Sequence, residues 1–84
     1  MEADEIRRRI KHIISNIANI PPDEIPDAAS YRSDLGLDSL SALEVVINVE
    51  AEFKVQLPEY EANEVESVDE TVRLVERYLP VATG

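Results

Sequence analysis

The sequence predicts an all-α fold: a small bundle of three main helices and one short helix, with a long loop between the first and second helices. Two observations predict this fold. Apolar residues recur every three or four positions in three segments, and prolines separate those segments. The 84 residues, 44% of them hydrophobic, suit one layer of packed helices around a single core. We therefore expect one domain over residues 1–84.

The first helix is expected over residues 3–18. One stripe of this helix is formed by isoleucines: Ile6, Ile10, Ile13, Ile14 and Ile17. The other side carries Arg7, Arg8 and Lys11, which we expect in solvent rather than in a nucleic-acid site, since the chain is acidic overall. His12, the only histidine, also points away from the stripe, so it is expected to be solvated and not a catalytic base.

A long loop is expected over residues 19–38. Pro21, Pro22 and Pro26 end the first helix and favour extended backbone, because proline lacks a backbone donor and restricts the residue before it. A loop of this length is unusual in so small a domain and is typical of a functional segment. Four apolar residues are expected to pin it to the core: Ile20, Ile25, Tyr31 and Leu35.

The second helix is expected over residues 39–53, with Asp38 as its N-cap after the flexible Gly36. Its core face consists of Ala42, Val45, Val46, Val49 and Phe53. The opposite stripe consists of Leu40, Glu44, Ile47 and Ala51. A helix packed on one core would leave this mixed apolar and acidic stripe facing water, which is typical of an interaction surface.

Two further helices complete the predicted bundle. Pro58 suits the first turn of a short helix over residues 58–64. Ser67 and Glu70 have the spacing of a capping box and predict a last helix over residues 68–79. Its buried face is expected to hold Val68, Val72, Val75 and Leu79, with Pro80 ending it.

The negative charge is concentrated in one half of the chain. Residues 33–70 hold eleven carboxylates and one basic residue, Lys54, and so carry the whole net charge of −10. Such a field repels nucleic acid and speeds encounter with basic protein surfaces. No stretch approaches the roughly 18 apolar residues of a membrane span, and the first residues lack a signal-peptide pattern. We expect a cytoplasmic protein that binds no nucleic acid and does not insert into membranes.

Enzymatic chemistry finds little support in the residues. The chain has no cysteine, one histidine and no G-x-S-x-G elbow around a serine, so a nucleophilic hydrolase is not expected. The segment 33–38 lacks the spacing of an EF-hand loop, and no metal site is expected. What remains is the segment Asp34-Leu35-Gly36-Leu37-Asp38-Ser39-Leu40, which ends the loop and opens the second helix. A phosphate on a serine in that first turn would meet free N–H groups and the positive end of the helix dipole.

The sequence resembles the acyl carrier protein family. The segment 34–40 matches the family's attachment motif, and the order of elements matches over nearly the whole chain, including Glu50-Ala51-Glu52-Phe53 before a proline and a valine-rich last helix. The resemblance implies a carrier, not an enzyme, with 4'-phosphopantetheine attached to Ser39 by a phosphopantetheinyl transferase. It also implies that Asp38 contacts the transferase's magnesium ion and that partners dock on Leu40, Glu44, Ile47 and Glu50.

The partners implied are acyl-transferring and condensing enzymes of fatty-acid or polyketide synthesis, with basic docking surfaces, and a monomeric carrier is expected. An acyl chain could lie between the helices, against Val46, Ile47, Val65 and Leu79. Two alternatives stay open: an aminoacyl or peptidyl carrier, and a helical interaction module with no prosthetic group. One departure from the family is Ser41, where many members have an acid.

Overall fold

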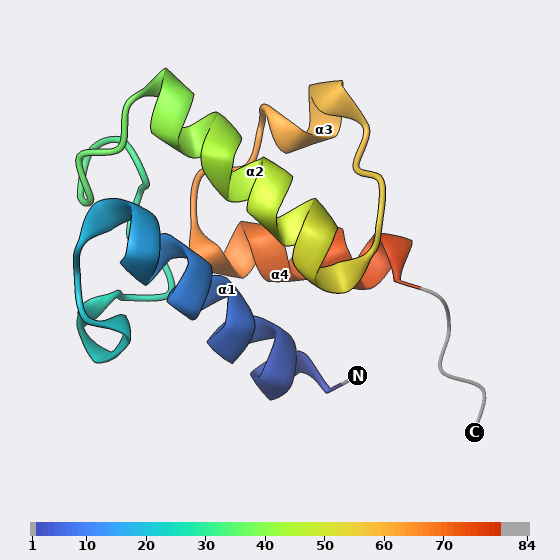
Figure 1. Cartoon of the computed structure of the whole chain (residues 1–84), viewed down its shortest axis with the longest axis horizontal. Helices are drawn as coiled ribbons and strands as arrows, with labels where there is room; N and C mark the ends of the chain where they lie inside the picture. The colour runs from blue at the N-terminus through green and yellow to red at the C-terminus, as the bar shows by residue number, and fades with distance from the viewer. Residues whose placement is uncertain (1, 80–84) are drawn as a thin grey trace.

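A computed structural model describes residues 2–79 and contains four α-helices and no strand in that range (Figure 1). The helices are α1 (Ala3–Ala18), α2 (Ser39–Phe53), α3 (Glu59–Ala62) and α4 (Val68–Tyr78), with a 3-10 turn η1 (Pro22–Glu24) in the long loop. The all-α prediction is confirmed. Within the described residues no helix is long and apolar enough to cross a membrane. The expected role of Pro80 lies outside the described residues.

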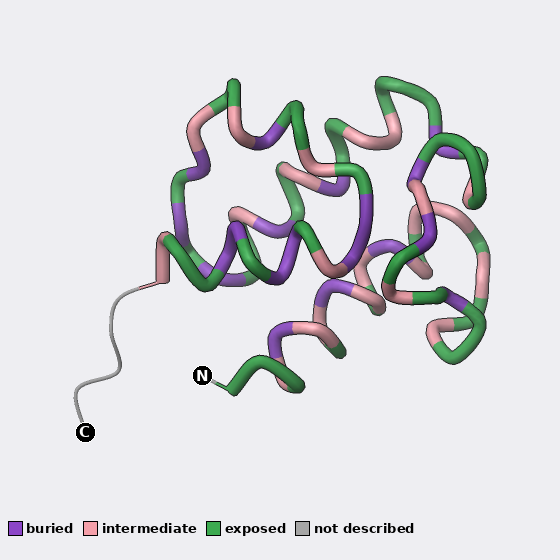
Figure 2. Tube along the Cα trace, turned by 180° about the vertical axis from the view of Figure 1, so that it is seen from behind, coloured by how far each residue is buried: buried purple, intermediate pink, exposed green. Residues whose placement is uncertain are grey.

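Helix α1 is the central packing element, because it contacts both α2 and α4. Ile6, Ile10 and Ile14 are completely buried, and the buried positions recur along one side of α1 (Figure 2). Burying an isoleucine side chain contributes about 1.5–3 kcal/mol, so this stripe is a large share of the core. The predicted stripe is confirmed, with Ile13 and Ile17 half-buried at its edges.

Helices α1 and α2 end in the same way. Asn19 (φ 60°) and Lys54 (φ 55°) both have left-handed backbone, and each donates its N–H to a carbonyl four residues earlier, that of Ser15 or Glu50. Left-handed caps satisfy carbonyls that the helix leaves unpaired. The turn after α2 then lets Val55 and Leu57 enter the core, although this short connection forms no helix.

The last two helices are shorter than predicted. Helix α3 covers Glu59–Ala62 instead of 58–64, since the N–H groups of Glu64 and Val65 bond three residues back and tighten the end of the helix into a turn. Helix α4 ends at Tyr78, and Leu79 has extended backbone (φ −70°, ψ 141°) and is half-buried. Helix α4 ends one residue earlier than predicted because Leu79 precedes Pro80 in the sequence, and proline disfavours helical backbone in the residue before it.

The capping box at the start of α4 is confirmed in one direction. The hydroxyl of Ser67 accepts from the N–H of Glu70 at 3.3 Å. The carboxylate of Glu70 accepts from the N–H of Glu66 at 3.2 Å, one residue before the usual partner. The box therefore also holds the segment that leads into α4.

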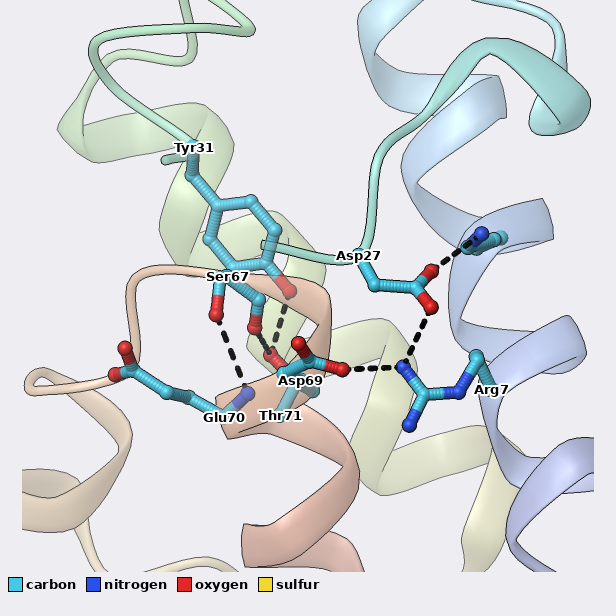
Figure 3. A network of polar contacts seen from close by, with 8 residues as sticks. Arg7, Asp27, Tyr31, Ser67, Asp69, Glu70 and Thr71 are labelled. Carbon is cyan, nitrogen blue, oxygen red and sulfur yellow. Dashed lines mark hydrogen bonds and ion pairs between the residues drawn. The ribbon is translucent and has the colours of Figure 1, made fainter. Parts of the chain in front are cut away.

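The long loop is tied to this same region of α4 by backbone bonds and by a side-chain bond between Tyr31 and Thr71, which Figure 3 draws. The N–H of Tyr31 donates to the carbonyl of Glu66 at 2.7 Å, and the N–H of Asp69 donates to the carbonyl of Asp27 at 3.0 Å. The hydroxyls of Tyr31 and Thr71, both buried, lie 2.5 Å apart. These bonds fix the middle of the loop against the start of α4.

A group of ion pairs joins the loop to α1 and α4. Arg7 contacts Asp27 at 3.1 Å and Asp69 at 2.5 Å, and Lys11 contacts Asp27 at 2.5 Å (Figure 3). The hydrogen bond from Lys11, and then the charges of Lys11 and Arg7, hold the pKa of Asp27 below its usual range. The basic face of α1, expected to be fully solvated, is thus partly engaged in holding the loop.

Candidate functional site

The segment that leads into α2 is a compact turn. The carboxylate of Asp34 accepts from the N–H of Ser30 at 2.7 Å, and the N–H of Leu37 donates to the carbonyl of Tyr31 at 2.8 Å. Gly36 has φ +70°, a conformation that costs glycine little and other residues more. Because Leu37 is buried and anchors the end of the turn, Asp38 and Ser39 after it are presented to solvent.

Asp38 is the N-cap of α2, as predicted. Its carboxylate accepts from the N–H of Ser41 at 2.8 Å, and this hydrogen bond is the main reason that the pKa of Asp38 is lowered. The side chain is exposed and ionised at neutral pH, so it has the charge needed to contact a metal ion held by a partner. The contact with the transferase's magnesium ion remains a prediction.

Ser39 is the first residue of α2 and is exposed. Its hydroxyl oxygen accepts from Nη2 of Arg32 at 3.2 Å. Of the N–H groups expected to be free for an attached phosphate, that of Ser41 already donates to the carboxylate of Asp38. An anion on Ser39 would therefore lie between a carboxylate and a guanidinium at the start of the helix.

A cavity of about 520 Å³ opens beside Ser39, between α2 and the segment from α3 to α4. This volume is typical of a small-molecule pocket. Apolar side chains from three parts of the chain line it: Ala42, Val46, Ile47, Val65 and Leu74. Arg32 and Ser39 also line it.

Three of the four residues expected to line an acyl site, namely Val46, Ile47 and Val65, line this cavity. Leu79 does not line it, and neither do Val68, Val72 and Val75 of the same predicted stripe, whereas Leu74 of α4 does. Leu74 lies outside the Val68, Val72 and Val75 stripe. An apolar residue beside that stripe was the sequence feature that could have indicated a second buried contact of α4.

The outer face of α2 is an apolar and acidic surface, as predicted. Leu40 is 66% exposed and Ile47 is 53% exposed, with Glu44 exposed between them. The sequence interpretation missed Leu43, which is 50% exposed and belongs to the same surface. The spacing of three and four residues from Leu40 through Leu43 to Ile47 was the signal that could have found it.

Glu50 differs from the other predicted docking residues. It is half-buried and lines the cavity, and its carboxylate accepts from the N–H of Leu57 at 2.9 Å. This bond holds the connection between α2 and α3. A charge reversal at Glu50 would disturb that connection as well as any docking, so Glu44 is the better position for a docking test.

The prosthetic group implied by the resemblance fits these residues. A serine hydroxyl is exposed at the mouth of an apolar cavity, and a guanidinium lies within hydrogen-bond distance of it. A phosphodiester needs an exposed hydroxyl and donors for its oxygens, and an acyl chain needs an apolar cavity.

Three comparisons with known proteins, by family model, by sequence and by structure, agree on one family. The model of the family described as "Phosphopantetheine attachment site" matches residues 8–75. Acyl carrier protein of Wolinella succinogenes is 33% identical over 67 residues, which cover 80% of this chain and 88% of that protein. A solved structure of acyl carrier protein from Enterococcus faecalis matches with a TM-score of 0.75 and 31% identity, covering 89% of this chain and 95% of that one.

Longer relatives match as well. Acyl carrier protein 2, mitochondrial, of Arabidopsis thaliana is 32% identical, and the mitochondrial acyl carrier protein of Neurospora crassa is 36% identical, each over 89% of this chain. The chain spans 60% and 57% of the length of these two relatives. The motif, the helical fold, the exposed serine and these likenesses agree, and the chain therefore belongs to the acyl carrier protein family and contains its phosphopantetheine attachment domain.

Proposed function

We propose that this chain carries acyl groups as thioesters on a 4'-phosphopantetheine arm attached to Ser39. The observation that carries the proposal is the exposed hydroxyl of Ser39 at the mouth of an apolar cavity of about 520 Å³. In the attachment step, the Ser39 oxygen bonds to the phosphorus of the pantetheine half of coenzyme A while the pyrophosphate linkage breaks. Adenosine bisphosphate leaves, and the hydroxyl proton passes to the transferase.

The cavity supports an acyl cargo over an aminoacyl one. It is lined by aliphatic side chains, Val46, Val65 and Leu74 among them, which favour burial of a hydrocarbon chain. Each methylene transferred from water into such a site contributes about 0.8 kcal/mol. A short polar aminoacyl group would gain little there.

The test is acylation of the phosphopantetheine-bearing protein with a medium-chain fatty acid by an acyl carrier protein synthetase. We expect intact mass to rise by one acyl group that neutral hydroxylamine removes, as a thioester requires. In the acylated protein, nuclear Overhauser contacts should join acyl methylenes to the methyl groups of Val46, Val65 and Leu74, and none should reach Leu79. These residues line the cavity whereas Leu79 does not.

Two results would contradict this proposal. Refusal of the fatty acid combined with loading of an amino acid by an adenylating enzyme would show an aminoacyl carrier. Acyl methylenes that all relax fully with a soluble paramagnetic agent would show that the cargo stays in solvent and that the cavity has another role.

The exposed face of α2 is proposed as the docking surface for the transferase and for acyl-transferring and condensing enzymes. Membership in the family implies partner enzymes, and the charge of residues 33–70 suits partners with basic surfaces. A monomeric carrier is proposed. The cytoplasm is proposed as its compartment, although the relatives from Arabidopsis thaliana and Neurospora crassa are named mitochondrial.

Glu44→Lys is expected to slow association with a basic partner about tenfold at low salt, because charges at the rim of an interface steer encounter. Glu44 makes no ion pair within residues 2–79, so unfolding free energy should change by about 0.5 kcal/mol or less. Stopped-flow binding to the transferase at two salt concentrations measures the rate.

Glu76→Lys is the matched control, since Glu76 is exposed on α4 and undergoes the same change of charge. It should leave most of the association rate intact. Equal slowing by the two variants would mean that net charge alone steers the partner, and that the face of α2 is no docking surface.

A further inference from the structure

Arg32 stands apart from most other basic residues of the chain. It is the only lysine or arginine between residues 13 and 53. Of the eight lysines and arginines, all within the described residues, five form ion pairs: Arg7, Arg8, Arg9, Lys11 and Arg77. Arg32 forms none there, although the chain carries a net charge of −10, and its guanidinium donates to the neutral hydroxyl of Ser39 at 3.2 Å.

While the hydroxyl of Ser39 stays unmodified, its hydrogen bond with Arg32 leaves most of the donors and the charge of the guanidinium without a partner among the described residues. An exposed hydrogen bond to a neutral oxygen adds little to stability, whereas a planar guanidinium can donate two parallel hydrogen bonds to a carboxylate or phosphate. The nearest acids along the chain are engaged elsewhere, Asp34 with the N–H of Ser30 and Asp38 with the N–H of Ser41. Arg32 is thus left with its charge uncompensated beside one particular oxygen.

Modification of Ser39 would put a negative phosphodiester at that oxygen. The carboxylate of Asp38, whose lowered pKa keeps it ionised, would repel it, and the rest of residues 33–70 adds nine further negative charges in net. The phosphorus would be bonded to the atom that Arg32 now contacts, so its free oxygens would come within reach of the same guanidinium.

We propose that Arg32 is a positioning residue that binds the phosphodiester on Ser39 and directs the arm toward the cavity. The inference rests on the proposed modification of Ser39. Arg32 and Ser39 both line the cavity beside α2, so an ion pair between Arg32 and the phosphodiester on Ser39 holds the base of the arm at the cavity. Without Arg32, repulsion by Asp38 favours an arm that points into solvent.

The experiment compares unmodified and phosphopantetheine-bearing forms of the wild type, Arg32→Gln, Arg32→Lys and Arg73→Gln. Arg73 is the matched control, because it is exposed on α4 and also forms no ion pair within the described residues. Intact mass first establishes that each protein carries the arm. The readouts are the phosphorus-31 resonance, the Nε–H signal of Arg32, and the change of Tm on modification.

The modified wild type and modified Arg73→Gln are expected to share one phosphorus resonance. In both proteins the Arg32 Nε–H signal should shift when the arm is attached. Arg32→Gln should move the phosphorus resonance, and Arg32→Lys should lie between, since an ammonium donates no parallel pair. Modification should raise Tm by about 2–4 °C more in the wild type than in Arg32→Gln. Raising sodium chloride from roughly 0.05 M to roughly 1 M should bring the two phosphorus resonances together, because salt screens an exposed ion pair.

The inference is overturned if modified Arg32→Gln and modified wild type share one phosphorus resonance at low salt and gain equally in Tm. A wild type that gains no mass with coenzyme A and a transferase overturns the proposed modification, and this inference with it. The first result leaves the proposed carrier function standing, so the two failures are distinguishable.

Discussion

Ser39→Ala is expected to abolish attachment of phosphopantetheine completely. The substitution removes the one oxygen that the turn and the N-cap present at the mouth of the cavity. Alanine is well tolerated in the first turn of a helix, and the lost hydrogen bond to Arg32 is exposed, so the fold should persist. Intact mass after incubation with coenzyme A and a transferase measures attachment, and circular dichroism checks the helices.

Ser33→Ala and Ser41→Ala are the controls for this prediction. Ser33 lies in the turn before the helix, and Ser41 lies in the first turn of α2, where its N–H donates to Asp38. Both variants should gain the full mass of one arm. Modification that persists in Ser39→Ala, or that disappears in one of the controls, would contradict the assignment of the site.

Thr71→Val is expected to lower the unfolding free energy by about 1–3 kcal/mol. The hydroxyl of Thr71 has a single proton, and it donates that proton to the carbonyl of Ser67 at 2.8 Å. The buried hydroxyl of Tyr31, 2.5 Å away, must therefore donate to Thr71. Valine keeps the shape of the side chain but leaves the tyrosine donor with no acceptor, and Tm should fall by roughly 4–8 °C for each kcal/mol.

Thr71→Ser is the matched control, because it keeps the hydroxyl and removes only a methyl group. Tyr31→Phe should cost less than Thr71→Val, since the bond from Thr71 to Ser67 survives it. In the double variant the two losses should be less than additive, because no donor is then left unpaired. Additive losses would show that the two hydroxyls do not interact in solution.

The same tyrosine predicts a loss of stability in alkali. Burial disfavours the phenolate and raises the pKa of Tyr31 above its ordinary value. The unfolded chain ionises near pH 10, so the stabilisation from the buried neutral phenol is complete below about pH 10 and is lost as the pH rises further. Urea denaturation over this range should show a steeper loss for the wild type than for Tyr31→Phe, and parallel losses would contradict the role of Tyr31.

The helices and the exposed position of Ser39 at the start of α2 were predictable from the sequence because their evidence is local. The isoleucine stripe of α1 follows from a repeat of three and four residues, and the cap of α2 follows from an aspartate before a helix free of proline. The predicted end of α4 was one residue too late, because proline disfavours helical backbone in the residue before it, which here is Leu79.

The details of the site were less predictable because they depend on contacts between distant segments. Glu50 lies on the docking stripe by periodicity, but its bond to Leu57 follows from the left-handed turn at Lys54. Arg32 had no sequence signal for its role, since its contact with Ser39 depends on the fold of the turn between them. That Leu74 lines the cavity depends on how α4 packs beside α2 and the segment after α3.

The bonds that hold the loop also set an order of events during synthesis. The loop before Ser39 takes its backbone partners from Glu66 and Asp69 and its side-chain partner from Thr71, all made well after Ser39 itself. While these residues are still inside the ribosome, the loop lacks these three partners and keeps only its local bonds, such as the one from the N–H of Leu37 to the carbonyl of Tyr31. The full set of bonds that fixes this loop can therefore form only after the chain has been synthesised through Thr71, at the start of α4.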